Sequence, residues 1–174
     1  MQVTFSIANV AWMITVAIGS ASTILVSHIY GSRNRDELRP TVNATYHLGL
    51  MWALFMAVIF ILFREPIATL FTDNSEVIAL TAQLMLLIAV YQFSDAVQGL
   101  SISMLRGIQD VKIIMPIVMC SYLLINIPVG CMLAYSFGME CHGLVIGLIL
   151  GLSVAALLTC VRLRRRISKF ERQE

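Results

Sequence analysis

The chain has 174 residues, of which 59% are hydrophobic and only 13% are charged, and its mean hydropathy is +0.85. Because a soluble domain carries about 25% charged residues, this composition excludes a soluble globular protein and indicates an integral membrane protein. The net charge of +2 says little about function by itself. In a membrane protein, the loops in which the Lys and Arg residues lie indicate its orientation. The four cysteines have no paired short spacing, so neither a disulfide framework nor a zinc site is predicted, and no nucleic-acid partner is expected.

Five hydrophobic segments are each long enough to cross a hydrocarbon core of about 30 Å. They run over residues 3–27, 43–63, 77–105, 113–135 and 143–161. Between the second and third segments, residues 65–72 carry an apolar stripe and predict a short interfacial helix. The chain is therefore expected to be an all-α membrane protein, with a transmembrane part over residues 1–162 and a basic tail over residues 163–174.

The basic residues predict the orientation of these spans. If the spans alternate in direction, all Lys and Arg residues except Arg64 lie on one side of the membrane. They are Arg33, Arg35, Arg39, Arg106, Lys112, Arg162, Arg164, Arg165, Arg166, Lys169 and Arg172. The positive-inside rule then places that side, with the C-terminus, in the cytoplasm and the N-terminus of the chain outside. The arginines of the tail also admit recognition of anionic lipid, beside the simpler interpretation that they anchor the helix end.

The third span contains one ionisable residue far from either end. Asp95 is the only charged residue between Glu76 and Arg106, and it lies eleven positions before Arg106, or about 16 Å along a helix. That depth is close to the middle of the membrane, where a charged group costs several kcal/mol unless something offsets it. Asp95 is therefore a candidate functional residue.

Polar neighbours accompany Asp95 on the same helix. Tyr91, Asp95 and Gln98 are spaced i, i+4 and i+7, with Ser94 beside them, so they form a polar stripe that must face protein or a wet cavity. No Lys or Arg lies deep in any predicted span, so a proton or a sodium ion is the expected partner of the carboxylate. Tyr91 offers a hydroxyl donor, and Ser94 and Gln98 offer oxygens to a hard cation. The alternative is a hydrogen-bonded acid that only holds helices together.

The last two spans carry packing signals. Pro128 removes a backbone donor and predicts a kink in the fourth span. Tyr122 and Asn126 are candidates to line a cavity, although Asn126 is equally well explained as a polar contact at the kink. In the fifth span, Gly143, Gly147 and Gly151 recur every four residues and predict close approach of a neighbouring helix.

Several motifs, in chain order, resemble the multidrug and toxic compound extrusion (MATE) family. The run Tyr91-Gln92-x-x-Asp95-Ala96-x-Gln98, followed by Leu105-Arg106-Gly107, is similar to helix ten of that family. Pro128-x-Gly130 is similar to helix eleven, and Gly143-Leu144-x-x-Gly147-x-x-x-Gly151 to helix twelve. The resemblance covers nearly the whole chain and implies helices eight to twelve, an incomplete six-helix lobe of a twelve-helix transporter.

The resemblance also implies a function. Members of the family are antiporters in the cytoplasmic (inner) membrane that expel cationic or amphipathic drugs in exchange for Na⁺ or H⁺ and need no other cofactor. It implies that Asp95 binds the coupling cation, that Tyr91 supports it, and that the chain works in the lipid bilayer with an N-terminal lobe and a helix seven that lie outside this sequence.

Three other classes of protein fit the sequence less well. A lipid-linked oligosaccharide flippase of the same superfamily shares the two-lobe plan, but the absence of deep Arg or Lys argues against its anionic substrates. A five-helix structural subunit would use Asp95 only to pair with another chain. An intramembrane enzyme is not expected, because aspartyl chemistry needs two carboxylates in one site and only one deep acid is present.

Overall fold

The computed structural model describes residues 2–63, 75–136 and 140–172, and every element in these ranges is helical. The elements are α1 (Gln2–Gly31), α2 (Arg35–Leu62), α4 (Ser75–Gly107), α5 (Ile114–Ser121), the π-helical turn η1 (Tyr122–Asn126), α6 (Ile127–Ser136) and α7 (Glu140–Arg172). Five spans are long and apolar enough to cross a membrane, with α5, η1 and the start of α6 forming one of them. The predicted all-α fold with five transmembrane helices is therefore confirmed. The interfacial helix expected at residues 65–72 lies outside the described residues.

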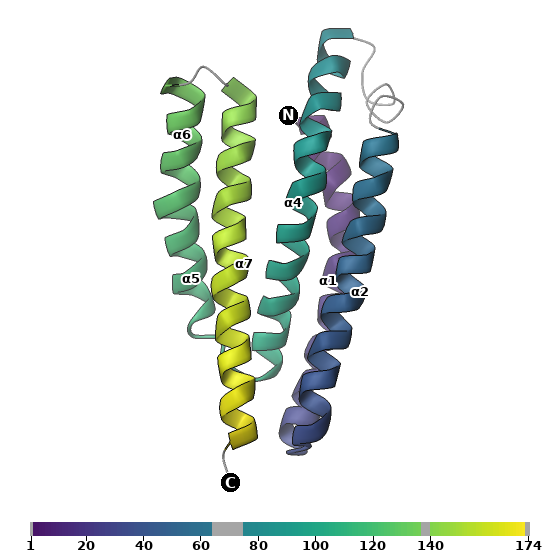
Figure 1. The fold of residues 1–174 in the computed structure, drawn as a ribbon, viewed down its shortest axis with the longest axis vertical. Coiled ribbons are helices and arrows are strands. Elements are labelled where there is room, and N and C mark those ends of the chain that lie inside the picture. Colours follow the sequence, from purple (N-terminus) through teal and green to yellow (C-terminus); the bar gives the residue numbers. More distant parts are fainter. Residues whose placement is uncertain (1, 64–74, 137–139, 173–174) are drawn as a thin grey trace.

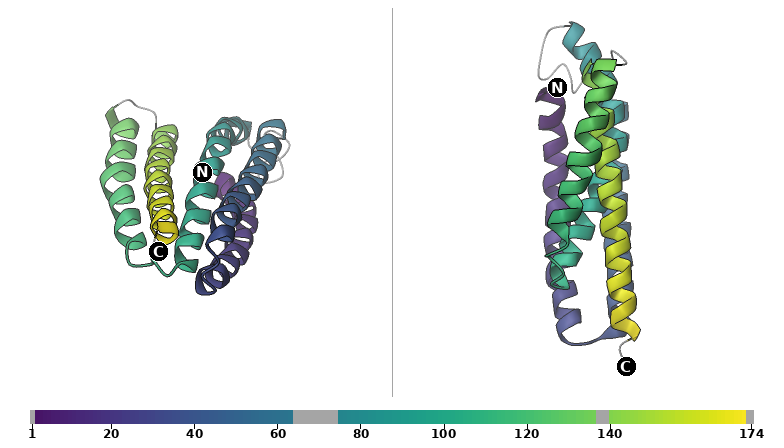
Figure 2. Two further views of the ribbon diagram at one scale, coloured as in Figure 1. Left: turned by 60° about the horizontal axis from the view of Figure 1, so that its bottom comes forward. Right: turned by 90° about the vertical axis from the view of Figure 1, so that its left-hand side faces the viewer.

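Helix α4 is the centre of the arrangement. It packs against α1, α2 and α7, whereas α5, η1 and α6 pack mainly against α7 (Figures 1 and 2). The molecule thus has a group formed by α1, α2 and α4, and an α5–α6–α7 group attached to it through α7. A residue on α4 can consequently face three different partners, depending on its position around the helix.

The polar connections gather at one end of the bundle. The turn between α1 and α2, the connection between α4 and α5, and the C-terminal end of α7 all lie at the lower end in Figure 1. This arrangement follows from spans that alternate in direction. The basic residues of these segments therefore share one end of the molecule, and the side of the membrane that this end faces stays a prediction.

Two helices extend further into this basic end than the sequence predicted. Helix α2 begins at Arg35 rather than at residue 43, and acids in its first turn, Asp36 and Glu37, stabilise that helix N-terminus. Helix α7 continues beyond residue 161 to Arg172, so the described part of the expected tail is helical. Basic residues in its last turn favour that C-terminus through the helix dipole.

A buried apolar core holds the basic end together. Its members come from α1, α2, α4 and the residue after it, and α7: Val26, Ile29, Leu38, Val42, Leu100, Met104, Leu105, Ile108, Leu163 and Ile167. Because Leu163 and Ile167 belong to the stretch expected to be a tail, that stretch is part of the packed structure.

Small residues let α1 and α4 approach closely. A Cβ added to Gly107 would lie 2.9 Å from the Thr23 carbonyl oxygen, and one added to Gly19 would lie 2.5 Å from Oγ of Ser103. The Thr23 hydroxyl donates to the Ser103 carbonyl oxygen at 2.8 Å. Such contacts replace the hydrophobic driving force that is missing between helices in lipid.

The predicted disturbance at Pro128 takes the form of a π-helical turn. Pro128 has no N–H to donate to the carbonyl four residues earlier, and its ring crowds that carbonyl. Immediately before it, Ile127 N–H donates to the carbonyl of Tyr122, five residues back. One wider turn therefore absorbs the defect and rotates the residues that precede it.

Candidate functional site

Asp95 is buried in the middle of α4, with 9% of its surface exposed. The Tyr91 hydroxyl, one turn earlier, lies 3.5 Å from its Oδ1, which is the long limit for a hydrogen bond. No ion pair with Asp95 occurs among the described residues, and both ion pairs between described residues involve Asp110. The carboxylate is therefore removed from water without a strong permanent partner.

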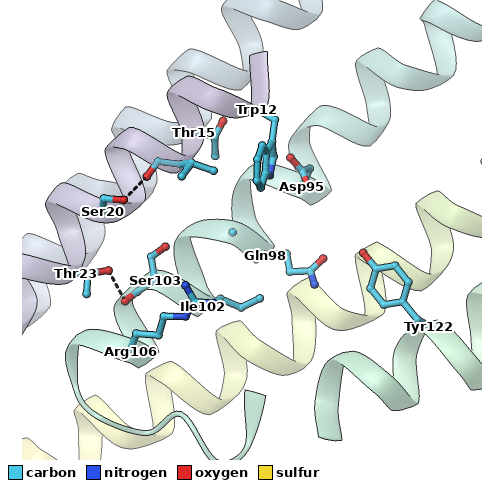
Figure 3. A pocket seen from close by; sticks show the side chains of 12 residues that line it. Trp12, Thr15, Ser20, Thr23, Asp95, Gln98, Ile102, Ser103, Arg106 and Tyr122 are labelled. Carbon is cyan, nitrogen blue, oxygen red and sulfur yellow. Dashed lines mark hydrogen bonds between the residues drawn. The ribbon is translucent and has the colours of Figure 1, made fainter. Parts of the chain in front are cut away.

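Asp95 lines a cavity of about 420 Å³ between α1, α4 and η1 (Figure 3). Its walls are Trp12, Thr15, Val16, Ser20, Thr23, Asp95, Gln98, Gly99, Ile102, Ser103, Arg106 and Tyr122. The α4 residues in this set repeat every three or four positions, so the cavity follows one face of the helix. It extends from Asp95 toward the basic end, where Arg106 forms its far wall.

Gln98 supplies a second candidate ligand in this cavity. Its side chain is 6% exposed, and its Oε1 has no hydrogen-bond partner. Because an unpartnered buried acceptor costs about 1–3 kcal/mol, such an atom in a native structure calls for an explanation. Tyr122 points its hydroxyl toward the Gln98 amide from the opposite wall (Figure 3). Asp95 and Gln98, which each carry a side-chain oxygen, thus line one cavity at membrane depth.

Two of the predicted site residues lie elsewhere. Ser94 does not line the cavity. Its hydroxyl lies 2.9 Å from that of Ser153 on α7, because one residue along a helix is a rotation of about 100° away from Asp95. The structure thus places Ser94 at a contact between α4 and α7 rather than in the lining of the cavity.

Asn126 is the other residue that the structure places away from the cavity lining. The π-helical turn brings it against α7, where a Cβ added to Gly151 would lie 2.6 Å from the Asn126 Cβ. A Cβ on Gly147 would collide with the backbone of Gly130. Tyr122 lines the cavity as predicted, whereas Asn126 packs on the glycine face of α7.

The structure adds residues that the sequence did not single out. Trp12 and Thr15 form the α1 wall, and Ser103 continues the α4 wall toward Arg106. Their roles depend on α1 packing beside this face of α4. The small residues Gly19 to Thr23 were the available signal for a close α1 contact, but they did not identify α4 as the partner.

A charged cluster lies at the basic end, around Asp110, which is outside the spans. Asp110, in the connection between α4 and α5, accepts hydrogen bonds from Arg162 at 2.8 Å and from Arg166 at 2.7 Å. Both guanidinium groups contact both carboxylate oxygens. Hydrogen bonds from Arg166 and then Arg162 hold the pKa of Asp110 well below its usual range. The cluster ties the connection to α7.

Comparisons with known proteins identify the fold and the family. The MatE family model matches residues 1–132. The chain is 36% identical over 167 residues to the multidrug resistance protein NorM of Photobacterium profundum, covering 94% of this chain and 37% of that protein. It is 34% identical over 166 residues to the multidrug resistance protein MdtK of Proteus mirabilis, covering 93% of this chain and 36% of that protein.

Solved structures agree with this assignment. The eukaryotic MATE transporter AtDTX14 superposes with a TM-score of 0.88 at 22% identity, over 98% of this chain and 39% of that one. An inward-facing multidrug resistance MATE transporter gives 0.89 at 18% identity, over 98% and 40%. The chain spans less than two fifths of the length of the curated NorM and MdtK relatives. With a family match over most of its residues and the fold of one portion of a MATE transporter, the chain belongs to the MatE family.

Proposed function

We propose that this chain forms part of a multidrug efflux antiporter and that Asp95 binds the coupling cation. The transporter exchanges cationic or amphipathic drugs for Na⁺ or H⁺ across the inner membrane. The names of the NorM and MdtK relatives support the multidrug part of this proposal. Alternating access requires two lobes that rock around a central site, so the chain acts together with the helices that its relatives have in addition.

The observation that carries the proposal is that Asp95 and Gln98, two buried polar side chains of α4, line the same cavity. Asp95 has no ion pair among the described residues, and Oε1 of Gln98 has no donor. A sodium ion would offset the cost of burial for both atoms at once, and a proton would do so for Asp95. Tyr91 is close enough to donate to the carboxylate while the cation is absent.

The orientation belongs to the same proposal. The basic end of the bundle, with the C-terminus of the chain, faces the cytoplasm, because Lys and Arg accumulate in cytoplasmic loops. The cavity extends from Asp95 to Arg106 at that end. In this arrangement the coupling cation leaves Asp95 along the α1–α4 wall toward the cytoplasm.

The test uses a twelve-helix transporter that contains this chain as its C-terminal part. Ethidium efflux is measured in cells under imposed Na⁺ or pH gradients, for wild type and Asp95→Asn. We expect the variant to reach the membrane at normal levels and to lose gradient-driven efflux. Asp36→Asn is the matched control, since it removes an exposed carboxylate from the first turn of α2. Unchanged coupled efflux in Asp95→Asn would contradict the proposal, whereas lost efflux with normal expression excludes a purely structural acid.

A further inference from the structure

A second cavity, of about 260 Å³, lies between α2 and α7 near the basic end. Its lining residues are Arg39, Val42, Asn43, Tyr46, Arg164 and Ile167, and we call it the α2–α7 groove. It shares no lining residue with the cavity that contains Asp95. Its role is therefore separate from that of the cation site.

The walls of the groove are held by the packed core beneath it. Val42 and Ile167 are 3% and 4% exposed, and both belong to the core cluster of the basic end. Tyr46, at the inner end of the groove, is hydrogen-bonded through its hydroxyl to Ser101 of α4 at 2.6 Å. The groove thus has an apolar floor and a fixed shape.

Three arginines of α7 face two different sides of the helix. Arg162 and Arg166 bind Asp110 on one side. Arg164 lies two residues from each, a rotation of about 200°, so it points to the other side and lines the α2–α7 groove. No carboxylate of the described residues pairs with it, and no acid is among the lining residues. The groove is lined by arginines of two helices, Arg39 and Arg164, and by the amide of Asn43, and Arg164 is the one whose guanidinium pairs with no described carboxylate.

Apolar surface continues from the groove along both helices. On α7, Leu157 and Val161 are 66% and 46% exposed, and they lie seven and three residues before Arg164, on the same face. On α2, Leu54 is 55% exposed and lies eleven residues, or three turns, after Asn43. A molecule in the groove would therefore have cationic groups at one end and a hydrocarbon-facing surface at the other.

We propose that the α2–α7 groove binds an anionic phospholipid of the surrounding leaflet. The phosphate lies between Arg39 and Arg164, near Asn43, and the acyl chains lie along Leu54, Leu157 and Val161. Basic pockets between transmembrane helices bind such headgroups, and guanidinium matches a phosphate through two parallel hydrogen bonds. A soluble anion would use the arginines but leave the apolar surface unused.

The test is native mass spectrometry of the purified protein in detergent, titrated with phosphatidylglycerol or with phosphatidylcholine of the same acyl chains. We expect phosphatidylglycerol to bind more tightly, and Arg164→Gln to weaken it by about fivefold, the value of one cationic residue at an anionic lipid surface. Arg165→Gln is the matched control. It removes the same charge from the adjacent exposed residue, which does not line the groove, and should change the affinity by less than twofold.

Two results obtained with these variants would overturn the proposal. Equal weakening by Arg164→Gln and Arg165→Gln would mean general attraction to the basic end, and no effect of either would mean that the groove does not hold the lipid. Arg164→Lys keeps the charge but loses the two parallel hydrogen bonds, so it should weaken binding less than Arg164→Gln does. Wild-type protein supplies an independent check, because glycerol 3-phosphate lacks acyl chains and should not displace the lipid. Displacement by glycerol 3-phosphate would assign the groove to a soluble phosphate instead.

Discussion

The Tyr91 hydroxyl lies 3.5 Å from Oδ1 of Asp95. The hydrogen-bond partner described for this buried carboxylate is therefore a distant donor on the same helix. A neutral donor at this distance offsets little of the free energy needed to bury a charge. On the proposed function, the coupling cation supplies the remainder. Tyr91 then acts as a positioning residue that is secondary to Asp95.

Tyr91→Phe should therefore weaken the response to the cation without abolishing it. Loss of the hydroxyl removes one weak contact, and the net value of such a hydrogen bond is about 0.5–1.5 kcal/mol. The apparent affinity for the cation should fall by roughly tenfold at most. Cation-dependent thermal stabilisation of the purified protein measures this change. A complete loss of stabilisation in Tyr91→Phe would mean that the hydroxyl, and not the carboxylate alone, forms the site.

Ser94→Ala should separate packing from cation binding. The Ser94 hydroxyl lies 2.9 Å from that of Ser153, and such hydrogen bonds between membrane helices contribute about 0.6 kcal/mol on average. We expect a slightly lower melting temperature and an unchanged cation response. Ser153→Ala should reproduce both results, because it removes the other half of the same contact. A lost cation response in Ser94→Ala alone would return Ser94 to the cation site.

Gly151→Ala should destabilise the α5–α6–α7 group. The added Cβ would lie 2.6 Å from the Asn126 Cβ and 3.1 Å from its Cα, so α7 and the π-helical turn must separate. Overpacking of this kind costs about 1–3 kcal/mol. Thermal unfolding in detergent measures the cost, with Gly31→Ala as the control because nothing lies within 4 Å of its added Cβ. Equal melting temperatures for the two variants would show that α7 does not pack this closely.

Asp110→Asn should lower the stability of the folded protein at neutral pH and make that stability less dependent on pH. The pKa of Asp110 is lowered in the folded protein by Arg166 and Arg162, so its contribution is present above the unfolded value of about 3.9 and is lost as the pH falls toward the folded pKa. Arg162 and Arg166 are 34% and 45% exposed, so we expect about 1 kcal/mol at pH 7. Melting temperatures at neutral and acidic pH should differ less in the variant than in wild type. An identical pH dependence would exclude the cluster as a source of stability.

The parts of the fold that can be predicted from the sequence are those that depend only on hydropathy and on the spacing of residues along one helix. Span length, the lone acid at Asp95 and the glycine spacing of α7 follow from hydropathy and helical geometry, and the structure has five spans with Gly147 and Gly151 at a close helix contact. The helical periodicity of Tyr91, Asp95 and Gln98 also indicated a common polar face. These features need no knowledge of which helices are neighbours.

The parts that the sequence left open depend on which helices are neighbours. Ser94 was assigned to the cation site because it is adjacent to Asp95 in sequence, but its face of α4 meets α7. Asn126 was a candidate for the cavity until the π-helical turn rotated it toward Gly151. Trp12 and Thr15 could not be linked to Asp95 without knowing that α1 packs beside it. The sequence predicts a tail after residue 162 because most residues there are charged. Leu163 and Ile167 are nevertheless buried in the core.

The most direct test of the central claim uses Trp12 as a reporter, because it lines the same cavity as Asp95. The sequence has two tryptophans, so Trp52→Phe leaves Trp12 as the single tryptophan. Its fluorescence is recorded while Na⁺ is varied at constant ionic strength, and separately while pH is varied without Na⁺. The account predicts a saturating response to at least one cation that Asp95→Asn abolishes in this background and Asp36→Asn leaves intact. The same saturating response with and without the Asp95 carboxylate would contradict the account.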